Sequence, residues 1–194
     1  MKIFFAVLSL VFGFAIFIPY FINIWKRTAR PHIFTWITWT ILAPIGFLAS
    51  FSKGGGGGSW IFLFQGTLCF LVVIYAVKNG EKNITTLDWV SFISALALCV
   101  FYIFTKQATL AAILAASIDG LSYIPTFRKS YNSPLSEPAL TYFFAVVTDC
   151  FAIAAIVNYN LATAFYPATL LIINAIMVGF LLIRRKTLAH EYHP

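Results

Sequence analysis

The sequence predicts an all-α membrane protein with seven transmembrane helices. Three observations support this fold class: 61% of the 194 residues are hydrophobic, only 10% are charged, and the apolar residues fall into seven long runs. An average soluble domain carries about 25% charged residues and could not hide this much apolar surface from water. The composition therefore excludes a soluble globular enzyme, a nucleic-acid-binding domain and a disordered chain, despite the net charge of +7.

The seven apolar runs are each long enough to form a helix across a bilayer, which takes roughly 20 residues. They cover about 3–25, 33–52, 60–77, 88–105, 107–127, 138–158 and 160–183. Their connections are short, so we expect one transmembrane domain over residues 1–194 with a short cytoplasmic tail at 187–194. The first run ends in IPYFINIWKR without a small-residue cleavage site, so we interpret it as a retained helix rather than a signal peptide.

The basic residues predict the orientation of the chain. With the N-terminus outside, ten basic residues fall in inside segments: Lys26, Arg27, Arg30, Lys78, Lys82, Arg128, Lys129, Arg184, Arg185 and Lys186. Only Lys2, Lys53 and Lys106 fall outside. Cytoplasmic loops of membrane proteins are enriched in Lys and Arg. We therefore expect an integral protein of the plasma (inner) membrane with an outside N-terminus and a cytoplasmic C-terminus.

An internal repeat relates the two halves of the chain. IPYFINIWKRTARPHIFTWITW begins at Ile18, and IPTFRKSYNSPLSEPALTYFFA begins at Ile124. Both have a proline near the end of a helix, then a basic loop, then a second proline, Pro31 or Pro138. We expect repeat one at about 1–78, a linker helix at about 88–105 and repeat two at about 107–186. The single linker helix makes the two triplets parallel, which is a transporter architecture.

This arrangement resembles the superfamily of SWEET, PQ-loop and nicotinamide riboside transporters over essentially the whole chain, and it is similar to prokaryotic relatives of that superfamily. The sequence has Pro19-Tyr20 and Pro125-Thr126 where PQ-loop proteins have Pro-Gln. The resemblance implies a 3+1+3 helix bundle and a substrate site between the triplets. It implies substrate contact for Asn174, on the third helix of its triplet, and a ring-stacking role for tryptophan on the second helix, of which Trp39 is the deeper candidate.

Two aspartates lie deep in apolar runs, Asp119 and Asp149. A carboxylate at that depth costs roughly 3 kcal/mol on insertion scales, so both should face the bundle interior, either for function or as hydrogen-bonded structural groups. Helical spacing places Ser122 and Tyr123 on the face of Asp119, and Tyr142 on that of Asp149. We predict that these residues, with Asn174 and Trp39, bind substrate. Asp88 opens the fourth run, and we interpret it as a helix cap.

Prolines and polar residues near the inner ends of the helices predict moving parts. In SWEETs, prolines act as hinges for alternating access, and Pro19 and Pro125 are the repeat-related pair here. Tyr20 and Asn23 share a helix face and are candidates for an inner gate. A tolerated kink is the alternative interpretation of the prolines.

The leading hypothesis is a transporter that moves a small polar solute, such as a sugar, nucleoside, vitamin or amine, by alternating access. Proton coupling through Asp119 and Asp149 stays open, as does a homo-oligomer. The alternative is a seven-helix receptor or ligand-binding protein without transport. We expect no enzymatic activity, since the Gly-x-Gly-Asp motif of intramembrane aspartyl proteases is absent. We expect no metal or other cofactor, because His32, His190 and His193 lie outside the deep parts of the runs.

Overall fold

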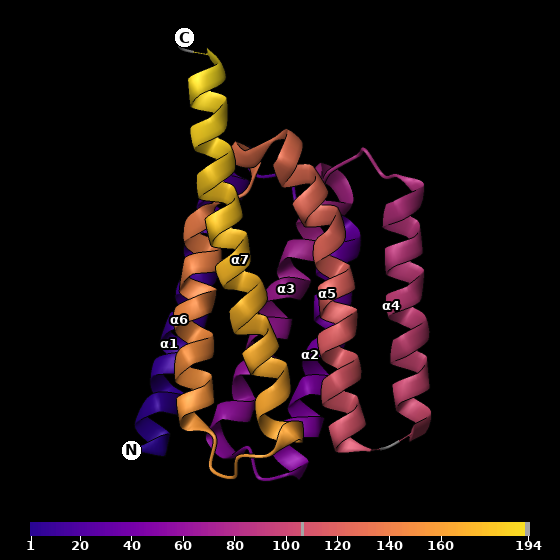
Figure 1. The fold of residues 1–194 in the computed structure, drawn as a ribbon, viewed down its shortest axis with the longest axis vertical. Helices are drawn as coiled ribbons and strands as arrows, with labels where there is room; N and C mark the ends of the chain where they lie inside the picture. Colours follow the sequence, from indigo (N-terminus) through magenta and orange to yellow (C-terminus); the bar gives the residue numbers. More distant parts are fainter. Residues whose placement is uncertain (106, 193–194) are drawn as a thin grey trace.

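The computed structural model describes residues 1–105 and 107–192, and these residues form a bundle of α-helices. The helices are α1 (Lys2–Trp25), α2 (Ile33–Ser52), α3 (Trp60–Asn79), α4 (Thr86–Thr105), α5 (Ala108–Asn132), α6 (Ala139–Ala155) and α7 (Leu161–Tyr192). Two short 3-10 turns, η1 (Gly56–Ser59) and η2 (Pro134–Ser136), lie in the connections before α3 and α6. The helices run up and down, so the termini lie at opposite ends of the bundle (Figure 1). We call these ends the N-terminal end and the C-terminal end.

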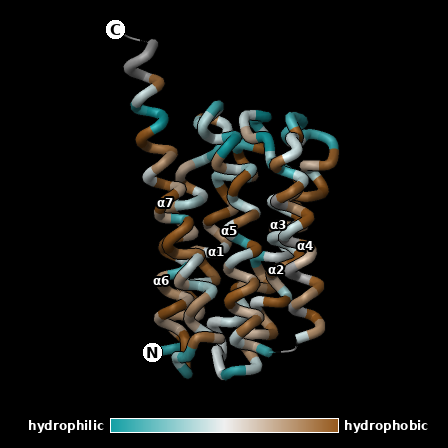
Figure 2. The backbone as a smooth tube through the Cα atoms, turned by 45° about the vertical axis from the view of Figure 1, so that its right-hand side comes forward, coloured by the Kyte–Doolittle hydropathy of each residue, from teal (hydrophilic) through white to brown (hydrophobic). Residues whose placement is uncertain are grey.

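The helices have the length and composition of membrane spans. Among the described residues, five segments are long and apolar enough to cross a bilayer: Lys2–Trp25, Ile33–Ser52, Gly56–Asn79, Ala108–Asn132 and Leu161–Leu188. The apolar helix α6 is shorter, with 17 residues. Figure 2 shows hydrophobic residues along the middle of the bundle and hydrophilic residues gathered at its two ends. The chain is therefore an all-α membrane protein, since this banding matches a bilayer with an apolar core and polar surfaces.

The packing order of the helices is the same in the two halves of the chain. In the first half, α3 packs against both α1 and α2; in the second, α7 packs against both α5 and α6. Across the halves, α1 lies along α6 and α2 lies along α5. Helix α4 packs mainly against α5, at the edge of the bundle (Figure 1).

Small residues bring the central helices close together. A Cβ atom on Gly66 of α3 would lie 2.4 Å from the Cβ of Ala43 on α2, so only glycine permits this approach. On α5, the buried alanines Ala111, Ala112 and Ala115 turn one smooth face towards the interior. Small residues serve this purpose in membrane helices, where association depends on close packing rather than on the hydrophobic effect.

Two helices extend well beyond their predicted ends, whereas α6 ends at Ala155 and not at about 158. Helix α5 continues to Asn132, not to about 127, and α7 continues through Tyr192, so the predicted tail from 187 is helical as far as it is described. The added turns have tertiary partners. Arg184 donates a hydrogen bond to the carbonyl of Tyr131, and Arg185 donates to the carbonyls of the α5–α6 connection. Sequence hydropathy alone cannot show these contacts, because they join polar segments far apart in the chain.

Candidate functional site

A cavity of about 100 Å³ lies inside the bundle. Six helices line it, represented by Phe17 from α1, Trp39 from α2, Gln65 from α3, Asp119 from α5, Asp149 from α6 and Asn174 from α7. No described residue of α4 belongs to the lining. The volume admits several water molecules and is smaller than the pockets of about 300–1,000 Å³ that hold drug-sized ligands.

Asp119 is held by two hydrogen bonds from other helices. The indole N–H of Trp39 on α2 donates to one carboxylate oxygen at 2.5 Å, and the Tyr166 hydroxyl on α7 donates to the other at 3.1 Å. The side chain is 2% exposed. Both carboxylate oxygens of Asp119 are thus engaged, and the residue joins α5 to a helix of each half.

Asp149 has a single donor in the part of the chain that the structure describes. Asn174 Nδ2 on α7 donates to Asp149 Oδ2 at 3.1 Å, and the Asn174 oxygen accepts a hydrogen bond of 2.7 Å from the Tyr123 hydroxyl. These two bonds fix the orientation of the Asn174 amide. The second oxygen of Asp149 therefore keeps its capacity to accept a hydrogen bond or to contact a positive charge.

Aromatic rings form much of the cavity wall. The Trp36 ring lies edge-on to Trp39, with centroids 4.9 Å apart, and Trp39 lies 5.1 Å from Tyr123. On the side towards the N-terminal end, Phe62 and Tyr166 stack almost in parallel at 5.3 Å. The ring contacts position Trp39, whose N–H then reaches Asp119.

Six of the seven predicted substrate-binding residues line this one cavity. They are Trp39, Asp119, Tyr123, Tyr142, Asp149 and Asn174. Ser122 does not line it: its hydroxyl donates to the carbonyl of Ile118, and its own carbonyl accepts a hydrogen bond from Thr35 on α2. Ser122 follows Asp119 by three residues, and at this position it faces α2 and not the cavity. Sequence spacing alone did not distinguish these two directions.

The predicted gate residues separate in the structure. Tyr20 is fully buried, with its ring centroid 4.7 Å from that of Trp36 at the edge of the cavity. Asn23 is not brought to the cavity, because its side chain accepts a hydrogen bond from Thr28 in the α1–α2 connection. Pro19 and Pro125 lie inside α1 and α5, which continue through them.

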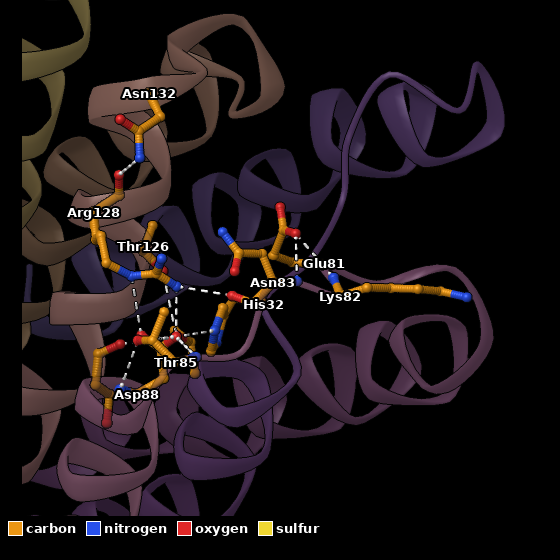
Figure 3. Close-up of polar contacts among 11 residues, drawn as sticks. His32, Glu81, Lys82, Asn83, Thr85, Asp88, Thr126, Arg128 and Asn132 are labelled. Carbon is orange, nitrogen blue, oxygen red and sulfur yellow. Dashed lines mark hydrogen bonds and ion pairs between the residues drawn. The ribbon is translucent and has the colours of Figure 1, made fainter.

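A polar network that the sequence analysis missed ties α4 to α5 at the C-terminal end (Figure 3). Asp88 accepts hydrogen bonds from the backbone N–H and the hydroxyl of Thr85. It therefore caps α4 from within the first turn, and Thr85, not Asp88 as predicted, holds the N-cap position. The same carboxylate also pairs with Arg128 at 2.5 Å and lies 3.6 Å from His32 Nε2. Asp88 is 0% exposed. It is therefore a buried ion-pair partner as well as a helix cap.

His32 is buried beside this ion pair. Neither ring nitrogen has a hydrogen-bond partner among the described residues. Burial lowers the pKa of His32 below its ordinary value of 6.5, and the nearby charges of Lys129 and Arg128 lower it further, against the opposing effect of Asp88. His32 is thus held as a neutral imidazole near neutral pH. The side chains of His190 and His193 lie outside the described residues.

A second ion pair lies at the C-terminal end of the bundle, next to the cavity. Lys129 near the end of α5 contacts the carboxylate of Glu137 and donates to the carbonyl of Arg30, between α1 and α2. Glu137 also accepts a hydrogen bond of 3.0 Å from Tyr142, which lines the cavity. The eight-residue separation of Lys129 and Glu137, across a helix break, is why sequence reasoning did not pair them.

No family model, curated protein or solved structure matches this chain. In the described residues, no group of three or more His, Cys, Asp or Glu side chains could hold a metal ion.

Proposed function

We propose that the protein is an integral membrane transporter that moves a small polar solute by alternating access around the central cavity. The observation that carries this proposal is the composition of the cavity lining, which comes from α1–α3 and α5–α7 without a described residue of α4. A site between two three-helix units opens to one side or the other when the units rock against each other.

The packing supports a 3+1+3 arrangement of seven spans, with α4 as the linker. The third helix of each triplet lies between the other two, and α1 and α2 of one triplet meet α6 and α5 of the other. The pairing of Pro19 with Pro125 also pairs Phe17 with Tyr123, and both of these side chains line the cavity. This correspondence is what a parallel repeat of the SWEET type would produce.

The C-terminal end has the features of a closed gate. Tyr20 packs against Trp36 of the cavity wall on the α1–α2 side. On the α5–α6 side, Tyr142 of the wall donates to Glu137, which contacts Lys129. Opening would part these groups. Pro19 and Pro125 lie in the same region, and each lacks the N–H that would complete the helix ladder, so a bend there costs less.

The charge distribution supports a cytoplasmic location for this end. Ten of the thirteen basic residues belong to the segments that meet at the C-terminal end. By the positive-inside rule, this end faces the cytoplasm of a plasma (inner) membrane, and the N-terminus lies outside.

Uptake into proteoliposomes tests the function. Purified protein is reconstituted and offered radiolabelled sugars, nucleosides, vitamins and amines, both as net uptake and as counterflow against preloaded solute. We expect saturable uptake of at least one solute, which Asp149→Asn reduces at least about tenfold. The matched control is Glu81→Gln, which makes the same chemical change in the α3–α4 connection, where Glu81 accepts only backbone hydrogen bonds from its neighbours in the described part of the chain.

Saturable binding without uptake or counterflow for any solute would refute transport and leave a receptor of the same fold. Equal loss of uptake in Asp149→Asn and Glu81→Gln would show that transport does not depend on this cavity.

A further inference from the structure

We propose that the solute bound in the central cavity is a small organic monocation, such as a protonated amine or a quaternary ammonium ion. This inference rests on the cavity of the proposed transporter and names the chemical class that it takes. Four features of the lining support it: its charge, its unused hydrogen-bonding groups, its aromatic wall and its volume.

The cavity has acidic side chains without basic partners. Asp119 and Asp149 both line it, and none of the described lining residues is Lys, Arg or His. The nearest basic side chains on α5, Arg128 and Lys129, are already paired with Asp88 and Glu137 at the C-terminal end. A buried carboxylate is stable only with a compensating charge or proton. A ligand cation would supply that charge, whereas an anionic ligand would add to the cost.

The hydrogen-bond donors of the cavity are largely used within the protein. Trp39 and Tyr166 donate to Asp119, Tyr123 donates to Asn174, and Asn174 donates to Asp149. Tyr142 donates to Glu137. The second oxygen of Asp149 remains as a free acceptor. A lining with these donors engaged and a carboxylate oxygen free suits a ligand that brings donors or positive charge.

One lining side chain is buried without a partner. The hydroxyl of Thr141 on α6 has no hydrogen-bond partner among the described residues, although the residue is 4% exposed and lines the cavity. An unmade hydrogen bond of a buried group costs about 1–3 kcal/mol unless something satisfies it. Gln65 on α3 is a further lining residue with both donor and acceptor groups. These groups would contact the polar part of an amino alcohol.

The aromatic wall provides the remaining surface for a cation. Trp36, Trp39 and Tyr123 form a continuous series of rings beside Asp119. The faces of such rings attract ammonium groups, most strongly where water is excluded. The volume of about 100 Å³ favours a compact ligand. Size, charge and aromatic character together favour a compact ammonium ion.

Equilibrium binding to the purified protein tests the proposal without requiring transport. The probes are ethanolamine, tetramethylammonium and choline, each titrated by calorimetry at pH 7.5. The decisive comparison is choline against 3,3-dimethyl-1-butanol, which has the same shape without the charge; glucose and acetate serve as further controls. We expect at least one cation to bind, and choline to bind at least about tenfold more tightly than its neutral analogue if it is the one that fits.

The variants locate the binding. Asp149→Asn removes the free carboxylate and should weaken cation binding at least about tenfold, whereas Glu81→Gln should leave it unchanged. Trp39→Phe keeps a ring but removes the N–H bond to Asp119, and should weaken binding less than Asp149→Asn. Circular dichroism and the melting temperature report whether each variant is folded.

The outcomes separate this inference from the proposed function. If none of the three cations binds more tightly than the neutral controls, the inference is wrong, while uptake of a neutral solute would still support transport. Suppose that a cation binds, that Asp149→Asn abolishes this binding, and that no uptake or counterflow occurs. The inference about the ligand class is then supported, and the proposed transport function is wrong. Cation binding that survives in folded Asp149→Asn would also overturn the inference.

Discussion

Buried acidic side chains have different partners in two regions of the bundle. At the C-terminal end, Asp88 pairs with Arg128, and Glu137 contacts Lys129. In the central cavity, the donors to Asp119 and Asp149 among the described residues are all neutral, from Trp, Tyr and Asn side chains. All four acids are 5% exposed or less. Burial is therefore common to both regions, and the partner is what differs.

We expect the partner to distinguish the acids that stabilise this protein from those that would bind a ligand. An acid that already has a basic partner stabilises one arrangement of helices, and its removal leaves the partner's charge buried. An acid with neutral partners leaves its charge available to a ligand. We therefore expect substitutions at the C-terminal end to act mainly on stability, and substitutions in the cavity to act mainly on binding.

The largest expected effect on stability follows from Lys129→Ala. The change leaves Glu137 buried without its basic partner, and breaking a buried pair in this way typically costs about 3–5 kcal/mol. Unfolding of the purified protein in detergent micelles measures it. The double variant Lys129→Met with Glu137→Gln should recover most of the loss, since no uncompensated charge remains. A single variant as stable as the parent would contradict a buried pair.

A smaller loss should follow from Arg128→Ala. The Arg128 side chain is 24% exposed, so water takes over part of its role, and Asp88 keeps its two hydrogen bonds from Thr85. We expect a loss of about 1–3 kcal/mol, typical of a hydrogen bond to a charged group. The same unfolding measurement applies, with Arg27→Ala as the control, because Arg27 is an exposed arginine of the α1–α2 connection. Equal losses in the two variants would show that the Asp88 pair contributes nothing.

Acid should destabilise the protein through His32. Its pKa is lowered by burial, so the unfolded chain binds more protons than the folded protein as the pH falls below about 6.5. This part of the stability is complete above pH 6.5 and is lost progressively from there down to the lowered pKa. Melting temperatures between pH 8 and pH 5 measure it. His32→Gln should make the melting temperature less dependent on pH in that window. An unchanged dependence would show that other groups cause the acid sensitivity.

The smallest effect on stability is expected for Asp149→Asn. Its one donor, Asn174, can turn its amide, and the Tyr123 hydroxyl can rotate to accept instead of donate, so the loss should stay below about 1 kcal/mol. Asp119→Asn should cost somewhat more, because Trp39 can only donate. Unfolding in micelles compares both with the parent. A loss of 3 kcal/mol for Asp149→Asn would place it with the structural acids and remove the contrast between the regions.

Much of the fold was readable from the sequence, because lipid imposes simple rules. In the described part of the chain, each of the seven apolar runs forms an α-helix, and the start of each helix lies within about two residues of its prediction. The ends of α5 and α7 were wrong, since polar turns continue a helix only where tertiary contacts such as that of Arg184 with Tyr131 hold them. Hydropathy records burial in lipid and does not record such contacts.

For the candidate site, too, some features were predictable from the sequence and others were not. The sequence alone determined that Asp119 and Asp149 face the interior, because a bilayer offers a carboxylate no partner. Only the tertiary structure decided which groups meet them. It brought Trp39 and Tyr166 to Asp119, left one oxygen of Asp149 free, turned Ser122 away from the cavity and paired Lys129 with Glu137. Helical spacing fixes a side chain's direction within its own helix, whereas its partner depends on the rotation and crossing of neighbouring helices, which packing determines.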